Sequence, residues 1–457
     1  MSDPYTRLYA GLFFPLQERL KGQGSATARR ALEHSQWLDP EALAALQLQR
    51  LRALLDHAGE HVPYYVRRFA ASGFDPARVT SPADLQRLPR LTKADIRAAS
   101  ASLRSARAGR LAMSSTGGSS GEPLNFWLGH DRIAHDVAAK WRAMRWWGVD
   151  MGDPEIVLWG SPIELGAQDR LRALRDRLQR SRLLPAFALS PARVQAFIGA
   201  IRQRRPRMLF GYPSALDHVA ATAEAGGRVL DDLDIRVAFV TGESLYPEQR
   251  ARIGRVFGCP VANGYGGRDA GFIAHECPEG GLHMTAEDIV VELLAPDGSP
   301  VADGEAGEVV VTHLASRDYP FIRYRTGDIA RRATAPCPCG RGLPLLAAVE
   351  GRSTDFVVAR DGTVMHGLAL IYVLRELPDI RAFRIVQETR ASIRVAVVPV
   401  GELAPATAAA IRSGMRARLG DVAVTVDAVA AIPPEASGKY RHVVSRLAEA
   451  HAHAPAA

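Results

Sequence analysis

The residues best suited to bind phosphate form one loop. It reads Ser114-Ser115-Thr116-Gly117-Gly118-Ser119-Ser120-Gly121-Glu122-Pro123. Glycines let the backbone turn where a side chain would clash, so that N–H groups and Ser or Thr hydroxyls can converge on anionic oxygens. The Gly-Lys-Ser/Thr ending of a P-loop is missing because Glu122 follows Gly121, which argues against a Walker-type site. Such a loop can also be an ordinary surface turn, so its function depends on the motifs that follow.

A second candidate for phosphate chemistry is Lys439, in the segment Ser437-Gly438-Lys439 near the C-terminus. A glycine-flanked loop can carry a lysine into a closing cleft, where the ammonium would neutralise charge that develops between a carboxylate and a phosphate. A lone lysine in a loop is normally exposed and inert. The position of Lys439 after all the other motifs is what favours a catalytic role.

Cysteines and histidines with the spacing of metal ligands lie in the second half of the chain. Five residues separate Cys277 from His283, and one residue separates Cys337 from Cys339 in a Pro/Gly turn. Two pairs of soft ligands on separate turns suit a tetrahedral Zn²⁺ ion, and four protein ligands would make the site structural. We therefore predict a structural zinc site, with His275 as the rival of His283. The alternative is three unrelated thiols and a hydrogen-bonded histidine.

Three short apolar segments read as strands that end in glycine turns. In an open α/β sheet, ligands bind at the carboxyl ends of such strands. We expect the turns to line one site, in which three glycines around a tyrosine would keep the backbone close to a flat ligand. The turns are Gly211-Tyr212-Pro213, Thr241-Gly242-Glu243-Ser244 and Gly264-Tyr265-Gly266-Gly267-Arg268-Asp269.

The elements around these motifs suggest three regions. Residues 1–110 read as helical, because leucines recur at amphipathic spacing between Leu43 and Leu55. Residues 111–352 form the predicted α/β core, with a solvated helix over 169–184. Beyond residue 352, three strands and a helix form a compact α+β unit over 353–457. These later elements are predicted at 384–386, 393–398, 405–419 and 422–426.

In their order along the chain, these motifs resemble those of the adenylate-forming (acyl-CoA synthetase-like) ligases, and within them the phenylacetate–CoA ligase branch. The series also includes Gly351-Arg352-Ser353 and is most specific in Arg323-Tyr324-Arg325-Thr326-Gly327-Asp328. Tyr265–Asp269 followed by Glu276-Cys277 is most similar to capsule-biosynthesis-type (CapK-like) members. The resemblance implies an α/β fold with a large N-terminal adenylate-forming domain, which has a helical cap and mixed sheets. A small, mobile α+β C-terminal domain would follow a hinge.

The resemblance also implies how ATP is bound. The loop at residues 114–121 would hold its phosphates. The backbone around Gly242, Glu243 and Ser244 would recognise adenine, and Tyr265 would stack near the base beside the close backbone of Gly266.

Three charged residues complete this implied site. Asp328 would accept hydrogen bonds from both ribose hydroxyls, which requires an ionised acceptor. Arg352 would contact the same ribose or the phosphate edge. Asp269 would bind the Mg²⁺ that bridges the ATP phosphates, although relatives usually have the longer Glu here and Mg²⁺ demands close octahedral geometry. Thr354 stands where relatives commonly have Asp or Lys, so the metal geometry and the domain rotation both stay open.

The implied reaction has two steps. A carboxylate, from an aryl or other organic acid, attacks the α-phosphate of ATP and gives acyl-AMP and pyrophosphate, with Lys439 stabilising the transition state. A thiol, by family default coenzyme A, then takes the acyl group. The acid would bind near residues 130–160, 211–216 and 240–266. The alternatives are transfer to an amine or sugar in polysaccharide or secondary-metabolite biosynthesis, and a non-catalytic assembly protein that retains the fold.

The charge and hydropathy of the chain indicate which kinds of partner to expect. Lys+Arg 57 against Asp+Glu 49 gives a net charge of +8. The arginines are spread along the chain, and positive potential also suits ATP, CoA or an acid substrate, so we expect no nucleic-acid partner. No apolar run reaches the roughly 18–20 residues of a membrane span and no signal-peptide core is present, which predicts a cytoplasmic protein. A homodimer is compatible with the resemblance, because dimers are common among similar proteins.

Overall fold

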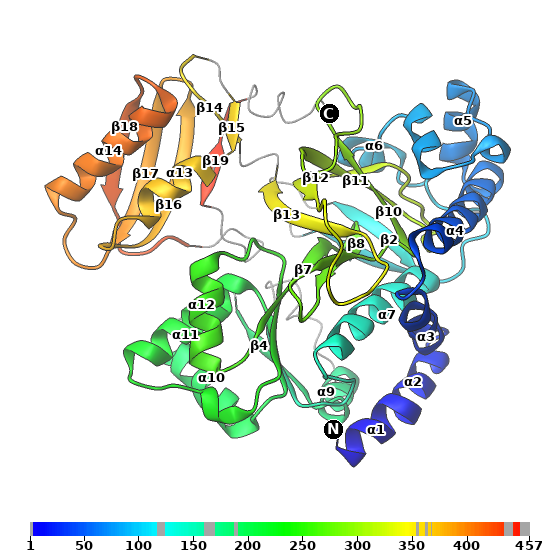
Figure 1. The fold of residues 1–457 in the computed structure, drawn as a ribbon, viewed down its shortest axis with the longest axis horizontal. Coiled ribbons are helices and arrows are strands. Elements are labelled where there is room, and N and C mark those ends of the chain that lie inside the picture. Colours follow the sequence, from blue (N-terminus) through cyan, green and yellow to red (C-terminus); the bar gives the residue numbers. More distant parts are fainter. Residues whose placement is uncertain are drawn as a thin grey trace.

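A computed structural model describes most of the chain (Figure 1). The described residues are 3–116, 124–159, 170–186, 191–352, 356–361, 364–366, 368–433 and 442–447. Among the helices within these ranges, none is long and apolar enough to cross a membrane.

The N-terminal region is helical, as predicted. Its longest helix, α4 (Pro40–His61), begins where the Asp39 side chain accepts a hydrogen bond from the Ala42 N–H, with proline at the first helical position. Leu51, Leu54 and Leu55 of this helix are fully buried. The other helices are α1 (Pro4–Leu8), a π-helical turn (Tyr9–Phe13), α2 (Phe14–Leu20), α3 (Ser25–Ser35), α5 (Pro63–Ser72), two 3-10 helices (Pro76–Arg78, Pro82–Arg87) and α6 (Lys93–Ala99).

An eleven-stranded sheet forms the core, in the order β10-β11-β12-β13-β9-β8-β7-β6-β5-β3-β4. The strands from β4 to β7 pair in parallel, and the others pair antiparallel. Their bounds are β3 (Glu155–Trp159), β4 (Ser181–Pro185), β5 (Met208–Gly211), β6 (Val237–Thr241), β7 (Val261–Gly267), β8 (Gly271–Glu276), β9 (Leu282–Met284), β10 (Ile289–Leu294), β11 (Ala306–His313), β12 (Tyr324–Arg332) and β13 (Leu345–Arg352).

Helices cover both faces of the parallel half of this sheet. Alternate residues of a strand point to opposite faces. Leu209 and Ala238 accordingly pack in the cluster that contains α10 (Pro191–Arg204), α11 (Pro213–Ala225) and α12 (Pro247–Phe257). Met208 and Val237 pack with α7 (His130–Trp146) on the other face. The parallel strands therefore lie between two helical layers.

The structure differs from the helix predicted over residues 169–184. Its helix, α9 (Arg170–Leu178), ends early, and residues 181–185 add the edge strand β4 to the sheet. Arg180 takes a φ of +56° between the two, which ends the helix. The apolar pair Leu183 and Leu184 lies in this strand, a pattern that the arginine-rich composition of the segment hid.

A small hairpin leads into the phosphate-loop segment. Strands β1 (Leu111–Ser115) and β2 (Asn125–Gly129) pair antiparallel, and α7 begins directly after β2. The hairpin therefore connects the loop at 114–123 to the long helix that packs under the sheet.

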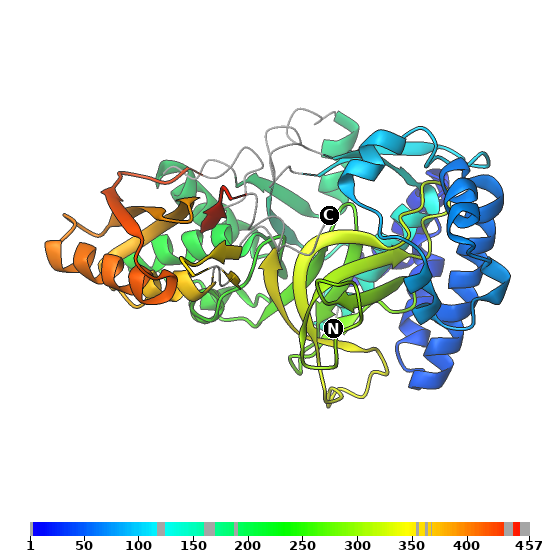
Figure 2. The same cartoon turned by 90° about the horizontal axis from the view of Figure 1, so that it is seen from above.

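The C-terminal region has a sheet and a core of its own. The sheet order is β18-β17-β16-β19, and a separate hairpin pairs β14 with β15. Figure 2 shows this region at the opposite end of the molecule from the N-terminal helices. The predicted α+β unit is confirmed. Its elements are β14 (Phe356–Val358), β15 (Val364–His366), α13 (Leu368–Arg375), β16 (Ile380–Thr389), β17 (Ser392–Pro399), α14 (Pro405–Leu419), β18 (Ala423–Ala428) and β19 (Val443–Ser445).

Candidate active site

Two of the predicted motifs meet through a reciprocal pair of hydrogen bonds. The Tyr265 hydroxyl, on β7, donates to Asp328 Oδ2 on β12 at 3.0 Å. The Tyr324 hydroxyl, on β12, donates to Asp269 Oδ2 after β7 at 2.5 Å. Each segment thus supplies one tyrosine and one aspartate, four residues apart. The predicted ribose acceptor and the predicted magnesium ligand are therefore tied to the same two strands.

The backbone around Tyr265 is as tight as its glycines predict. A Cβ on Gly266 would lie 2.2 Å from the Gly271 carbonyl oxygen, and one on Gly264 would lie 2.7 Å from the Phe239 ring. No side chain fits at either position. Close contact between strands, and not a flexible hinge, explains these glycines.

The start of the phosphate-loop segment lies beside the Asp269 turn. The Arg268 guanidinium donates to the Ser115 carbonyl oxygen at 3.3 Å. The Thr116 hydroxyl accepts the Leu124 N–H at 3.0 Å, and Ser114 lies in β1. The remaining predicted residues of the loop, Gly117, Gly118, Ser119 and Gly121, lie outside the described residues.

Gly242, Glu243 and Ser244 follow β6 at the carboxyl edge of the parallel strands. Gly242 has a φ of +84°, and a Cβ there would lie 3.1 Å from Tyr212 and 3.2 Å from Trp159. The rings of Trp159 and Tyr212 stack with their centroids 4.1 Å apart. An aromatic wall therefore borders the Gly242 turn.

The Glu243 side chain has a structural contact that the sequence did not suggest. Its Oε2 accepts the backbone N–H of Ser214 at 3.2 Å, at the start of α11. A carboxylate at this position interacts favourably with the positive end of the helix dipole. Ser244, the next residue, is exposed.

The remaining predicted nucleotide residues are placed in part. Asp328 and Arg352 are Cα partners on the neighbouring strands β12 and β13. Lys439 and Thr354 lie outside the described residues. His442, the first described residue after Lys439, has its ring centroid 5.9 Å from that of Tyr246. Tyr246 lies two residues after Ser244, so the chain returns to the Gly242 turn just after the lysine.

The structure brings the predicted cysteines together with one of the two candidate histidines. The ligand atoms of Cys277, His283, Cys337 and Cys339 all lie within 4.8 Å of one another. The Cys277 and Cys337 sulfurs are 3.5 Å apart, and the Cys339 sulfur is 3.2 Å from His283 Nε2. The rival His275 is outside the cluster, fully buried and stacked on Phe272.

Sequence reasoning missed Tyr324 as a functional residue. Tyrosine and aspartate recur with the same spacing in Tyr265–Asp269 and in Tyr324–Asp328, which was the available signal. The neighbouring arginines brace the strand. Arg323 pairs with Glu292 at 2.8 Å, and Arg325 pairs with Glu308 at 2.8 Å.

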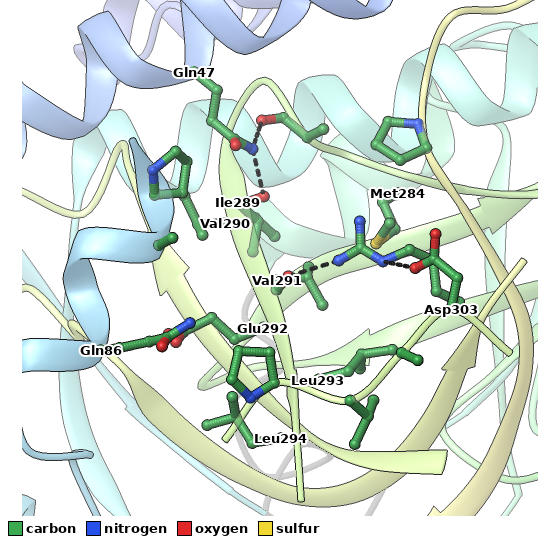
Figure 3. Close-up of a pocket in the computed structure, with 18 residues that line it drawn as sticks. Gln47, Gln86, Met284, Ile289, Val290, Val291, Glu292, Leu293, Leu294 and Asp303 are labelled. Atoms are coloured by element: carbon green, nitrogen blue, oxygen red, sulfur yellow. Dashed lines mark hydrogen bonds and ion pairs between the residues drawn. The ribbon is translucent and has the colours of Figure 1, made fainter. Parts of the chain in front are cut away.

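A cavity of about 330 Å³ lies beside β10, and among the predicted site residues that the structure describes none lines it (Figure 3). It lies at the outer edge of the large sheet. Gln47 donates to the Ile289 carbonyl there, Arg332 to that of Val291 at 3.5 Å, and the Val301 N–H to that of Leu293 at 3.0 Å. These groups cap alternate carbonyls of an edge strand, which blocks edge-to-edge pairing. We assign this surface a structural role.

Sequence comparison identifies two known domains. The AMP-binding enzyme family matches residues 115–314, and the CapK C-terminal domain matches residues 357–446. The chain is 28% identical to phenylacetate–coenzyme A ligase of Escherichia coli (strain K12) over 331 residues, which are 70% of this chain and 73% of the relative. It is 22% identical to protein CapK of Staphylococcus aureus over 345 residues, 73% of each chain.

Solved structures share the fold. A 2-hydroxyisobutyryl-CoA ligase in the postadenylation state with R3-HIB-AMP superposes with a TM-score of 0.72 at 21% identity, covering 91% of this chain and 92% of that chain. The amide bond synthetase McbA from Marinactinospora thermotolerans superposes with a TM-score of 0.52 at 20% identity, covering 72% and 66%. At such identities the likeness establishes the fold alone, and the two neighbours differ in their named chemistry.

Proposed function

Because the chain belongs to the adenylate-forming ligases, in the branch of phenylacetate–CoA ligases and CapK-like proteins, we propose that it activates an organic acid with ATP and transfers the acyl group to coenzyme A. The observation that carries this proposal is the reciprocal Tyr265–Asp328 and Tyr324–Asp269 pair. It ties the proposed ribose acceptor, Asp328, and the proposed metal ligand, Asp269, to the same two segments of the chain. A nucleoside triphosphate with its metal ion needs both groups at one site.

Three features support an ATP site at this place. Asp328 is held by Tyr265, so its carboxylate has a fixed position for the ribose hydroxyls. Gly242 has no side chain at a position where a Cβ would press on Tyr212 and Trp159, so the backbone of this turn can lie close to the two rings. The loop that begins at Ser114 has the glycines and hydroxyl side chains that suit phosphate binding.

The residues also fit a magnesium ion. Asp269 is half-buried, and its carboxylate offers the oxygen ligands that Mg²⁺ prefers. Oδ2 is held by Tyr324, and Oδ1 lies 2.8 Å from the place that a Cβ on Gly267 would take. When bound, the ion would neutralise charge on the ATP phosphates. Asp269 would hold it, with the carboxylate orientation set by Tyr324.

Lys439 is the proposed catalytic residue for adenylation. Its ammonium would offset the charge that develops as the acid carboxylate attacks the α-phosphate. The contact between His442 and Tyr246 supports this role, because it returns the chain to the Gly242 turn three residues after the lysine. We propose that residues 353–457 act as a mobile lid on the core at 111–352, with the hinge near Thr354.

Aromatic rings support an aryl acid as the substrate. Trp159, Phe210 and Tyr212 gather behind Gly242, and the Lys140 ammonium lies 3.8 Å from the centre of the Phe210 ring. Such a wall suits a flat apolar group, and a nearby cation suits an acid. The pocket predicted from segments 130–160, 211–216 and 240–266 therefore remains our choice for the acyl group.

An amine or sugar acceptor is the second candidate, favoured by the match to the CapK C-terminal domain. The two acceptors are separated by incubating protein, ATP and a panel of acids with CoA, with amines or amino sugars, or with neither. Under our proposal, AMP release rises when CoA is added, and an acyl-CoA appears by mass spectrometry. If AMP release does not change when CoA is added but rises with an amine or an amino sugar, the acceptor is the amine or sugar.

We further propose that Cys277, His283, Cys337 and Cys339 bind a structural zinc ion. Three thiolates and an imidazole suit Zn²⁺, and four protein ligands leave no open position for catalysis. His283 Nδ1 lies 3.3 Å from the Leu343 carbonyl oxygen, a contact that orients Nε2 toward the cysteines. A Cβ on Gly281 would lie 2.6 Å from the Cys337 sulfur, so glycine keeps the cluster compact.

Elemental analysis of the purified protein tests this site. We expect about one zinc per chain, lost in Cys337→Ser together with a lower melting temperature. Cys259→Ala is the matched control, because Cys259 is buried outside the cluster. Folded wild-type protein that contains no zinc and is not destabilised by a chelator would refute the proposal.

A further inference from the structure

Asp269 lies in a tight turn between β7 and β8. The two strands pair as far as Gly267 and Gly271, which leaves only residues 268–270 for the turn. Gly271 adopts a φ of +89°, a conformation that favours glycine. The place of the Asp269 carboxylate therefore depends on what holds this short turn.

Tyr324 holds the turn from one side. Its side chain is fully buried, and its hydroxyl donates to Asp269 Oδ2 at 2.5 Å. The backbone on either side of Tyr324 is bonded to Leu91, through the Arg323 carbonyl at 2.8 Å and the Arg325 N–H at 3.0 Å. Because the Tyr324 ring is buried and its backbone is held on both sides, its hydroxyl fixes the orientation of the Asp269 carboxylate.

Arg132 holds the turn from the other side. Its Nη2 reaches the Arg268 carbonyl oxygen at 3.5 Å, and its Nε donates to Asp136 Oδ2 at 2.9 Å. His313 Nδ1 accepts the Ala315 N–H at 3.3 Å, so Nε2 carries the proton that faces Asp136. Arg132 is thus fixed in a buried polar cluster.

The turn rests directly on this cluster. A Cβ on Gly271 would lie 2.8 Å from the His313 ring and 3.0 Å from both Arg132 and Asp136. Burial alone would raise the pKa of Asp136, but Arg132 and His313 lower it to about 2, which keeps the carboxylate ionised. The support under the turn is therefore an intact ion pair at neutral pH.

We propose that Tyr324 and Arg132 are positioning residues that hold Asp269 where it binds nucleotide-bound magnesium. The proposal rests on the adenylate-forming function. Aspartate has less reach than glutamate, so a magnesium ion with strict geometry needs the shorter side chain on a fixed turn. The two contacts supply that fixed position from opposite sides.

The chain offers matched controls for both residues. Tyr319 is buried in the same core and donates to Ser100 at 3.1 Å, so Tyr319→Phe removes a comparable hydroxyl away from the turn. Arg142 lies on α7, like Arg132, and forms a buried ion pair with Glu287. Arg142→Lys therefore perturbs a comparable pair on the same helix.

The test measures ATP binding by calorimetry in full-length protein over a series of Mg²⁺ concentrations, and again with EDTA. Tyr324→Phe keeps the ring and its packing, and Arg132→Lys keeps a charge beside Asp136. We expect Tyr324→Phe to raise the Mg²⁺ concentration for half-maximal binding about tenfold and Arg132→Lys about threefold, in line with the loss of one charge-assisted hydrogen bond. Binding in EDTA, and both controls, should match wild type.

The outcomes separate a failure of the proposed function from a failure of the positioning role alone. Wild-type protein that binds no ATP with or without Mg²⁺ would remove the proposed function, and this inference with it. Wild type that binds ATP with Mg²⁺, beside a folded Tyr324→Phe variant with the same Mg²⁺ dependence, would refute the positioning role alone. A shift shared by Tyr319→Phe would also refute it, because any lost buried hydroxyl would then have the same effect.

Discussion

The Tyr265 hydroxyl donates a hydrogen bond to Asp328 at 3.0 Å, across strands that are not neighbours in the sheet. Three strands, β8, β9 and β13, stand between β7 and β12 in the strand order. The sheet must therefore curl to bring the two side chains together. In this curled region, a residue expected to stack near adenine also holds the residue expected to bind ribose.

This bond predicts a selective defect in Tyr265→Phe. Without the hydroxyl, the Asp328 carboxylate loses one fixed orientation, at a cost of about 1 kcal/mol, or roughly fivefold in affinity. The KM for ATP in ATP–pyrophosphate exchange should rise by that factor, while the KM for the acid stays constant. An equal rise in both KM values would indicate a general disturbance of the fold instead.

The Gly242 turn predicts a loss of stability in Gly242→Ala. The left-handed backbone at this position costs an alanine about 1–2 kcal/mol, and the Cβ would press on Tyr212 and Trp159. Urea unfolding should show a free energy lower by at least that amount. Gly199→Ala is the control, because no atom of the described residues lies within 4 Å of the place that its Cβ would take in α10. That change should stabilise the protein by about 0.5–1 kcal/mol.

His313 predicts a loss of stability in acid. Burial and the charge of Arg132 lower its pKa to about 4 from the ordinary 6.5, and the hydrogen bond with Asp136 only partly opposes them. Between these values the unfolded chain binds a proton that the folded chain does not, so the free energy of unfolding falls as the pH drops from 6.5 toward 4. The contribution is roughly 3 kcal/mol at most.

Urea unfolding between pH 7.5 and 4.5, in wild type and in His313→Gln, measures this contribution. The variant should lose less free energy over the interval than wild type does, since its glutamine cannot titrate. Parallel curves for the two proteins would show that His313 carries no such linkage.

The buried Arg323–Glu292 pair predicts a large loss of stability in Arg323→Met. Both side chains are less than a tenth exposed, so removing the arginine leaves a buried carboxylate without its partner, at a cost of about 3–5 kcal/mol. The control is Arg202→Met, which breaks a pair with Asp232 whose side chains are half exposed. Its cost should stay below about 1 kcal/mol. Similar losses in the two variants would contradict this account of burial.

Local sequence patterns predicted much of the fold. The turns after residues 210 and 240 lie at strand ends, because apolar runs that stop at glycine depend on neighbours along the chain. The predicted turn at Gly264–Gly267 was wrong, because these residues pair with β8 and continue strand β7 to Gly267. The helix predicted over 405–419 has those bounds, because an alanine-rich stretch follows Pro405 and ends before Gly420. The helix predicted over residues 169–184 was wrong in part. Residues 181–185 form a strand because they pair with β3, which the local sequence does not show.

The site was less predictable than the fold. The bond from Tyr324 to Asp269 joins residues 55 positions apart, and its geometry depends on the curl of the sheet. Arg132 showed no periodic signal beyond its place on a helix, yet it reaches the Arg268 carbonyl. Such contacts are set by packing between distant segments, whereas the spacing of the cysteines and His283 was visible along the chain.

We propose above that this chain adenylates a carboxylic acid with the help of Lys439. This activity is measured by carboxylate-dependent ATP–pyrophosphate exchange over a panel of aryl, fatty and sugar acids, with wild type beside Lys439→Ala. We expect exchange with at least one acid, most readily an aryl acid, and a loss of at least a hundredfold in the variant. Exchange that persists unchanged in Lys439→Ala, or none from folded wild-type protein supplied with Mg²⁺ across the panel, would contradict it.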